Sequence, residues 1–294
     1  VARLLAPFRF LPDWRIDDIM VSFAATGGSV GPHTDQYDVF LLQAQGRRRW
    51  QLAERFDPTL RGDCELKVLQ RFDPERELIA EPGDLLYLPP GVAHFGVALD
   101  EAMTFSIGLR APDQQELMRA LARELASDAR PSERFSDPGR RATNDPTRLD
   151  GDDLARLRDL LRRGMLASDA ELDAFIGRYL TRSKHNLELQ GEATSAADVR
   201  RRLAVGQRLV RREGSRWTWL ERGAELWVFA EGHEQRLDEA HRVWLEPLLA
   251  HQPLDGAAFG GSALEAGGAA LAGLAAWLER GALEWHSNDD DPDR

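Results

Sequence analysis

Cysteine and long apolar runs are both scarce in this chain, and each absence excludes a class of protein. The 294 residues contain one cysteine, Cys64, which excludes an internal disulfide framework and favours a reducing compartment such as the cytoplasm. The longest apolar stretch, GGAALAGLAAWL, is about a dozen residues, well short of the roughly 20 that a membrane span needs. No charged and apolar leader opens the chain, so we expect a cytoplasmic protein without membrane contact.

Positive charge is also in short supply. The formal net charge is -11, and residues 186–294 alone carry 12 Arg against 19 Asp plus Glu. Attraction to the phosphates of nucleic acid is therefore not favoured, and a basic protein partner is. This balance argues against a DNA-binding role for the C-terminal part of the chain.

The N-terminal part of the chain reads as a series of short strands. The length favours two or three domains, and the abrupt opening ARLLAPFRFLPDWRIDD is typical of the interior of a domain, so we expect an N-terminal segment to be missing. Residues 1–111 hold β-branched or aromatic runs bounded by Gly, Pro or Asp, such as YDVFLLQ, RRRWQLA and AMTFSIGL. Many short strands with tight turns predict a β-barrel or sandwich.

A helical block and a mixed unit follow the strands. Residues 112–185 show leucines at helical spacing, and the pair Ser168 and Glu171 fits a capping box at a helix start. Residues 186–294 hold six of the eight tryptophans, more consistent with a core than with a recognition surface, and alternate strand-like and helix-like runs. We predict a small α+β domain of winged-helix type there. Amphipathic helices too short to bury themselves make the helical block a candidate homodimer interface.

The stretch GPHTDQYDVF sets His33 and Asp35 two positions apart at the start of a β-prone run. Side chains at i and i+2 of a strand point to one face, so both could ligate one metal ion. The alternative is a histidine at a strand edge that hydrogen-bonds a neighbouring aspartate. About sixty residues on, EPGDLLYLPPGVAH delivers His94 after a strand and a turn. Two histidines and one carboxylate on one face of a metal are typical of non-haem Fe(II) oxygenases.

Arg48 is the second candidate for function. Alternation in the strand RRRWQLA puts Arg48, Trp50 and Leu52 on one face, which we expect to be buried. A buried guanidinium needs an anionic partner. That partner is either the far carboxylate of a bound dicarboxylate or an acidic side chain of the barrel, and spacing does not choose between them.

Four stretches of the chain are LPDWRIDDIMVSF, GGSVGPHTDQYDVFLLQAQGRRRW, EPGDLLYLPPGVAH and AMTFSIGLRAP. Together they closely resemble the bacterial ribosomal oxygenases of the JmjC/cupin-4 group, which hydroxylate an arginine of large-subunit ribosomal protein sixteen. The resemblance covers nearly the whole chain in order and implies a double-stranded β-helix (cupin/JmjC) barrel, a helical dimerisation block and a C-terminal winged helix. It also implies a cytoplasmic enzyme that uses Fe(II), O2 and 2-oxoglutarate to hydroxylate the β-carbon of an arginine in a ribosomal protein.

The resemblance assigns roles to particular residues. His33, Asp35 and His94 match the iron ligands, and Arg48 matches the arginine that binds 2-oxoglutarate. Around the cosubstrate, Ala24 stands where the family carries a serine and Thr104 where an asparagine is common. Thr104 can still donate a hydrogen bond, and Ser22 and Ser106 are the candidates to replace the serine.

Three alternative functions are compatible with these residues, and the residues that would hold the substrate are not identified by spacing. A histidine of a ribosomal protein could be the substrate, the barrel could be a metal-binding cupin that does not use 2-oxoglutarate, or the C-terminal unit could be regulatory. A substrate arginine needs carboxylate and aromatic groups at the mouth, and Asp18, Tyr37 and Asp38 are available. Spacing does not select among these three.

Overall fold

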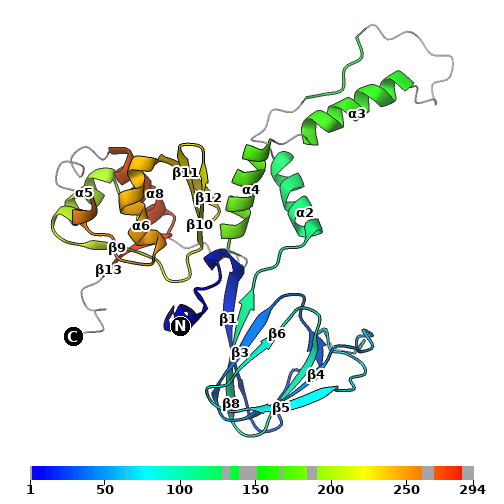
Figure 1. Ribbon diagram of the computed structural model, residues 1–294. Helices are drawn as coiled ribbons and strands as arrows, with labels where there is room; N and C mark the ends of the chain where they lie inside the picture. The colour runs from blue at the N-terminus through cyan, green and yellow to red at the C-terminus, as the bar shows by residue number, and fades with distance from the viewer. Residues whose placement is uncertain are drawn as a thin grey trace. The chain divides into compact units, whose positions relative to one another are not determined.

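The computed structural model describes residues 2–63, 65–127, 133–138, 151–165, 168–183, 191–259 and 268–286. Cys64 and His185 lie outside these ranges. The chain divides into two compact units, Val1–Pro112 and Asp113–Arg294, which we call the barrel unit and the C-terminal unit (Figure 1).

The barrel unit contains two four-stranded antiparallel sheets (Figure 1). The first sheet has the order β1 (Ile16–Ala24), β8 (Ala102–Leu109), β3 (Val39–Gln45) and β6 (Leu85–Leu88). The second has the order β2 (His33–Thr34), β7 (Ala93–Ala98), β4 (Arg48–Ala53) and β5 (Arg76–Ala80). The neighbours in each sheet are mostly distant in sequence, as in a double-stranded β-helix, so the predicted barrel is confirmed.

Alternation along the strands builds the inside of the barrel. Val39 and Leu41 of β3 are buried together with Trp50 of β4 and Leu88 of β6. β3 ends at Gln45 and β4 begins at Arg48, so only Gly46 and Arg47 form the turn between them. Gly46 has φ 62 in that turn, a left-handed conformation that favours glycine.

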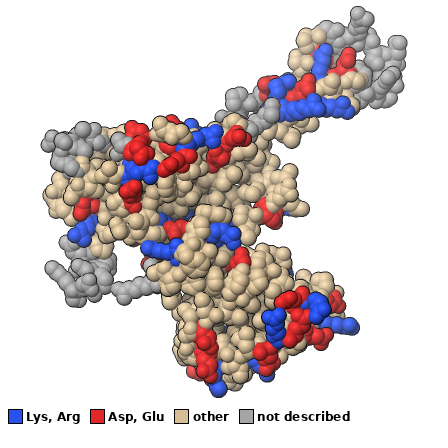
Figure 2. Space-filling model, in the orientation of Figure 1, with Lys and Arg blue, Asp and Glu red and all other residues tan. Residues whose placement is uncertain are grey.

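Two segments outside the strands pack on or bond to the barrel. Before β1 lie α1 (Ala2–Leu5), η1 (Ala6–Phe8) and η2 (Asp13–Arg15), and buried Phe8 packs on Phe40 with ring centroids 5.1 Å apart. The long connection between β4 and β5 carries interspersed acidic and basic residues (Figure 2). Within it, the Leu69 N–H donates to the Pro32 carbonyl at 2.7 Å, which ties this connection to the start of β2.

The C-terminal unit begins with three helices, α2 (Gln114–Leu125), α3 (Gly151–Met165) and α4 (Asp169–Thr181). The predicted capping box is present, because Ser168 accepts from the Glu171 N–H and the Glu171 carboxylate accepts from the Ser168 N–H. Although we placed α4 in the helical block, it packs on a three-stranded sheet through Ala174, which lies against Trp227 and Phe229.

The rest of this unit mixes strands and helices as predicted. Its elements are α5 (Ala196–Ala204), β9 (Arg208–Arg211), β10 (Trp217–Arg222), β11 (Glu225–Ala230), β12 (His233–Asp238), η3 (Glu239–His241), α6 (Arg242–Leu249), η4 (Gly256–Phe259), α8 (Gly268–Glu279) and β13 (Leu283–His286). β10, β11 and β12 form the antiparallel sheet, and β9 pairs with β13. Sequence periodicity missed α5 and β9, which are short.

Most tryptophans of this unit lie in its core, as expected. Trp217, Trp227, Trp244 and Trp277 are at most 3% exposed, whereas Trp219 is 40% exposed. None of the helices in the described ranges combines the length and apolar character that a membrane crossing requires.

Candidate metal centre

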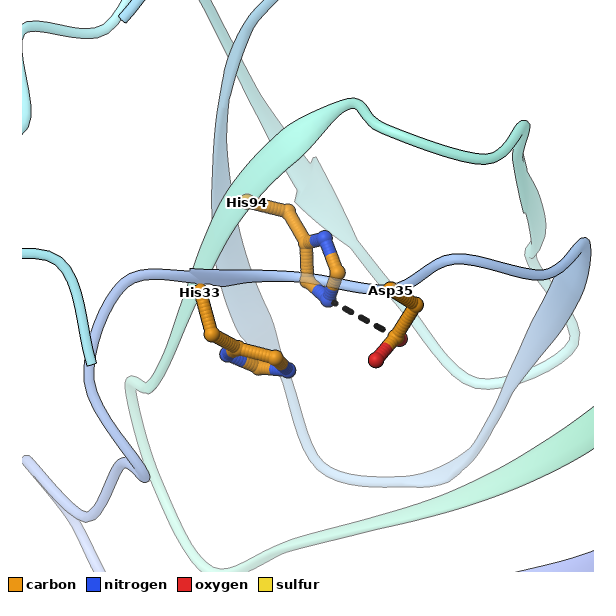
Figure 3. Close-up of side chains that lie close together, drawn as sticks. All are labelled: His33, Asp35 and His94. Atoms are coloured by element: carbon orange, nitrogen blue, oxygen red, sulfur yellow. Dashed lines mark ion pairs between the residues drawn. The ribbon is translucent and has the colours of Figure 1, made fainter. Parts of the chain in front are cut away.

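His33, Asp35 and His94 lie together inside the barrel unit (Figure 3). β2 pairs with β7 so that His33 stands directly opposite His94, and one potential ligand atom from each of the three residues lies within 4.8 Å of the others. The nearer Asp35 oxygen is 3.7 Å from Nε2 of His94. β2 ends at Thr34, so Asp35 follows the strand and is not inside it as we expected. The pairing of β2 with β7 nevertheless brings the two histidines into contact, although they lie about sixty residues apart in the sequence.

Backbone carbonyls set the orientation of both imidazoles. Nδ1 of His33 lies 3.0 Å from the Gly31 carbonyl, and Nδ1 of His94 lies 3.0 Å from the Val92 carbonyl. A carbonyl can only accept, so each Nδ1 carries the proton and each Nε2 presents its lone pair. The two rings lie edge to face with centroids 4.2 Å apart. This arrangement prepares two nitrogen ligands for one ion.

The surroundings of the site keep its groups in the form that suits a metal. Burial lowers the pKa of His94, and the neighbouring His33 acts in the same direction. The neutral imidazole is the form that binds metals. Burial also raises the pKa of Tyr37 to about 12, with the negative charges of Asp35 and Asp18 adding to the shift. Tyr37 therefore stays protonated and hydrogen-bonds to Asp35.

Trp50 and Arg48 follow His94 along the inside of the barrel, and Gly96 leaves room for the Trp50 ring. The Trp50 ring lies 6.1 Å from the His94 ring, and the guanidinium carbon of Arg48 lies 5.7 Å from the Trp50 ring. Arg48 and Trp50 are 8% and 6% exposed, as alternation predicted, whereas Leu52, the third residue of the predicted face, is half-buried. A methyl group on Gly96 would lie 2.6 Å from the Trp50 ring, so only glycine leaves room for this indole.

Arg48 is a buried cation with an unused donor. Its Nε is buried and has no hydrogen-bond partner, and across the described ranges no ion pair involves this side chain. Burial lowers its pKa. The alternative in which Arg48 pairs with an acidic barrel residue therefore finds no support in the described chain. An unpaired guanidinium in a low-dielectric interior is costly, and a bound anion would offset that cost.

Three small polar residues near the β3–β4 turn hydrogen-bond to one another or to the backbone of the barrel. Thr104 is 1% exposed and its hydroxyl donates to Oε1 of Gln43 at 3.0 Å. The Gln43 amide donates to the carbonyls of Gln45 and Gly46. Ser22 donates to the Thr104 carbonyl at 3.3 Å. The donor capacity that we expected of Thr104 and Ser22 is thus used within the barrel, and each hydroxyl can still accept.

Sequence reasoning missed Gln43 altogether. It is 1% exposed and holds both Thr104 and the β3–β4 turn. The available signal was its position: alternation along the strand puts residue 43 on the same buried face as Val39 and Leu41.

The three candidates at the mouth separate into two groups. A methyl group on Gly108 would lie 3.1 Å from the Asp18 carboxylate and 3.7 Å from the Tyr37 ring, so these two side chains lie beside each other over Gly108. Asp38, by contrast, accepts from the Tyr87 hydroxyl at 2.6 Å and from Arg15 at 3.0 Å. The structure thus brings Asp18 and Tyr37 toward Asp35 and commits Asp38 to other partners.

Two family models match the chain. A JmjC domain covers residues 3–117, and a ROXA-like winged helix covers residues 164–284, so the second match includes α4.

Individual proteins and a solved structure also match the chain. The ribosomal protein uL16 3-hydroxylase of Escherichia coli is 36% identical over 264 residues, which cover 88% of this chain and 68% of that protein. A probable ribosomal oxygenase of Haemophilus influenzae is 45% identical over 130 residues, covering 42% of this chain and 31% of that protein. The solved structure of YcfD, a ribosomal oxygenase from E. coli in complex with cobalt and 2-oxoglutarate, has a TM-score of 0.75 at 34% identity and covers 97% of this chain and 74% of that chain.

Proposed function

This chain belongs to the JmjC-domain ribosomal oxygenases related to the E. coli uL16 3-hydroxylase, and from that premise we propose that it hydroxylates the β-carbon of an arginine side chain in a large-subunit ribosomal protein. It is an Fe(II)- and 2-oxoglutarate-dependent dioxygenase. The observation that carries this proposal is one barrel interior that holds three possible metal ligands and a buried arginine, Arg48, whose Nε has no hydrogen-bond partner among the described residues. The E. coli structures with cobalt and 2-oxoglutarate, and with cobalt and succinic acid, fit the same chemistry.

The iron would be held by Nε2 of His33, Nε2 of His94 and the Asp35 carboxylate. Two nitrogens and one oxygen on one face are the donor set of non-haem Fe(II) oxygenases, and they leave the opposite face open. Iron bound in this way, with 2-oxoglutarate and O2, supplies an oxidant that inserts one oxygen atom into a C–H bond while 2-oxoglutarate becomes succinate and carbon dioxide.

Arg48 would bind the distal carboxylate of 2-oxoglutarate. A guanidinium can hold a carboxylate through two parallel hydrogen bonds, and its buried Nε is free for one of them. Trp50 lies between Arg48 and His94 and would exclude water along the length of the cosubstrate. The barrel thus orients the cosubstrate by charge at one end and by the metal ligands at the other.

Asp18 and Tyr37 would hold the substrate arginine. Asp18 is an exposed carboxylate that can pair with a guanidinium, and the Tyr37 ring beside it offers an aromatic face. The raised pKa of Tyr37 keeps its hydroxyl protonated at neutral pH, so no second negative charge develops beside Asp35.

The direct test combines Fe(II), 2-oxoglutarate and ribosomal protein uL16, and then locates any mass gain of one oxygen atom by tandem mass spectrometry. We expect the gain on an arginine. His33→Ala and His94→Ala should abolish both turnover and Fe(II) binding, whereas His286→Ala in β13 serves as the matched control and should retain both. A modification on histidine would contradict the arginine assignment. Oxygen consumption that does not depend on 2-oxoglutarate would instead favour another metal-binding cupin.

We also propose that the enzyme is a homodimer that works in the cytoplasm, where its ribosomal protein substrate is made. Neither α2 nor α3 contains a fully buried residue. Three of their apolar side chains are largely exposed: Met118 at 62%, Leu161 at 66% and Met165 at 71%. Apolar side chains at helical spacing gain free energy when a second copy covers them. Light scattering at micromolar concentration tests this, since a clean monomer mass would exclude the dimer.

A further inference from the structure

The C-terminal unit contains a groove between strand β10 and helix α6. It has a volume of about 350 Å³ and is lined by Trp219, Leu226, Arg242, Leu245, Glu246, Leu249 and Ala250. Leu226 and Leu245 are each 1% exposed and form its apolar floor. The groove belongs to the C-terminal unit, whereas His33, Asp35 and His94 belong to the barrel unit.

Trp219 distinguishes this groove from ordinary surface. β10 is an edge strand of the three-stranded sheet, and Trp219 is 40% exposed while four other tryptophans of the unit are in the core. On the helix side, Arg242, Leu245 and Leu249 recur at helical spacing and turn toward the strand. A half-exposed tryptophan over a leucine floor is the composition of a binding hot spot.

Of the residues that line the groove, Arg242 and Glu246 are charged, and Glu221 and Glu239 lie against Arg242; we call these three glutamates the acidic rim. Arg242 lies 2.5 Å from Glu221, 2.6 Å from Glu239 and 3.9 Å from Glu246. The three carboxylate side chains are 57%, 68% and 63% exposed, whereas Arg242 is 28% exposed and stacks over Trp219 at 5.4 Å. In Figure 2, acidic and basic residues lie interspersed over the part of this unit where Figure 1 places α6. Three carboxylates around one guanidinium leave exposed negative charge that suits a cationic occupant.

We propose that this groove is a docking site for a basic segment of the ribosomal protein substrate, a proposal that rests on the function proposed above. An apolar side chain of the segment packs beside Trp219, and its lysines or arginines face Glu221, Glu239 and Glu246. Proteins that bind ribosomal RNA carry such Lys- and Arg-rich segments. RNA itself is a poor occupant, because its phosphates would meet the acidic rim.

A second contact on the same substrate chain has a specific kinetic consequence. The barrel recognises the region around one arginine, and docking elsewhere raises the local concentration of that arginine at the barrel. The groove therefore affects KM for the whole ribosomal protein and leaves kcat unchanged. It has no effect on a short peptide that contains only the target arginine and its neighbours.

The test compares these two substrates in the full chain. Glu246→Lys reverses one exposed charge of the rim, and Trp219→Ala removes the apolar wall. Each should raise KM for whole uL16 about fivefold, the effect of roughly one exposed charge pair or contact, with kcat and the peptide KM unchanged. Glu279→Lys, the same charge reversal at an exposed position of α8, is the matched control and should change neither constant.

The outcomes separate this inference from the function on which it rests. If the wild type hydroxylates both substrates and neither variant changes KM for whole uL16, or if the peptide KM rises equally, the docking site is wrong. If Trp219→Ala changes the molecular mass in light scattering and leaves KM unchanged, the groove holds a second copy of this chain and the proposal is overturned. If the wild type hydroxylates nothing, the proposed function fails. Equilibrium binding of whole uL16 then tests the groove, with a fivefold loss in Glu246→Lys expected and no loss contradicting it.

Discussion

Replacing Arg48 with methionine should make the metal-free protein more stable and should remove its response to 2-oxoglutarate. Arg48 is 8% exposed, its Nε has no hydrogen-bond partner, and burial lowers its pKa. Methionine has a similar length and is apolar, so the change removes a desolvated charge without opening a large cavity. Relief of an unsatisfied buried polar group is worth about 1–3 kcal/mol. For a chain of this size each kcal/mol raises Tm by about 2–4 °C.

The same change should weaken the binding of 2-oxoglutarate. A hydrogen-bonded contact between charged groups contributes about 2–3 kcal/mol, so KM for 2-oxoglutarate should rise about 30-fold to 150-fold. The two effects have opposite signs because one side chain is unfavourable without an anion and favourable with it. A residue kept for stability alone would show destabilisation and no change in KM.

Thermal unfolding with and without 2-oxoglutarate, together with succinate formation, measures both effects. At a concentration near the wild-type KM, 2-oxoglutarate should raise Tm of the wild type and leave Tm of Arg48→Met almost unchanged, because the variant binds it about 30-fold to 150-fold more weakly. Arg49→Met is the control for the cosubstrate effect: Arg49 is half-buried on the other face of β4 and its Nε is also buried without a hydrogen-bond partner, so this variant should share the gain in stability and retain the response to 2-oxoglutarate. A variant that is less stable than the wild type and keeps a normal KM would refute the reasoning and indicate a structural ion pair.

Three further predictions concern single positions. Gly96→Ala places a methyl group 2.6 Å from the Trp50 ring, so it should lower the free energy of unfolding by about 1–3 kcal/mol in urea denaturation and raise KM for 2-oxoglutarate. Thr181→Val removes the hydroxyl that accepts from the Gly232 N–H at 3.1 Å, and should cost about 1–3 kcal/mol in the same assay while kcat stays unchanged. Burial raises the pKa of Glu231 above its usual value near 4.5, so the folded state binds more protons than the unfolded state just above that pH, and stability falls as pH rises through the folded pKa. Glu231→Gln should therefore stabilise the protein at neutral pH, and the gain should disappear below about pH 4.5 in a pH series of unfolding curves, whereas a gain that persists there would contradict this account.

Local pattern was enough for much of the fold. The alternation around Arg48 and Trp50 predicted their burial, and the Ser168–Glu171 pair predicted a helix start, because strand and helix periodicities and caps depend on neighbours a few residues away. The order of strands, helices and a mixed C-terminal unit followed from the same signals. The resemblance added the identity of the barrel and the roles of its metal ligands.

Contacts between distant strands were beyond such patterns. Spacing could not choose among Asp18, Tyr37 and Asp38, and the structure separates them because Asp38 already holds Arg15 and Tyr87. Nor could spacing show that Gln43 takes the hydroxyl donor of Thr104, sixty-one residues away.

The amino-acid sequence by itself determined which faces of the strands are apolar, where helices begin and which residue types could bind a metal. The tertiary structure alone decided that His33 and His94 meet, that the Nε of Arg48 finds no hydrogen-bond partner among the described residues and that Trp219 lines an acidic-rimmed groove. The physical reason is that periodicity sets the direction of each side chain along its own strand or helix, while the pairing of β2 with β7 and the packing of α6 beside β10 depend on chain segments far apart in the sequence.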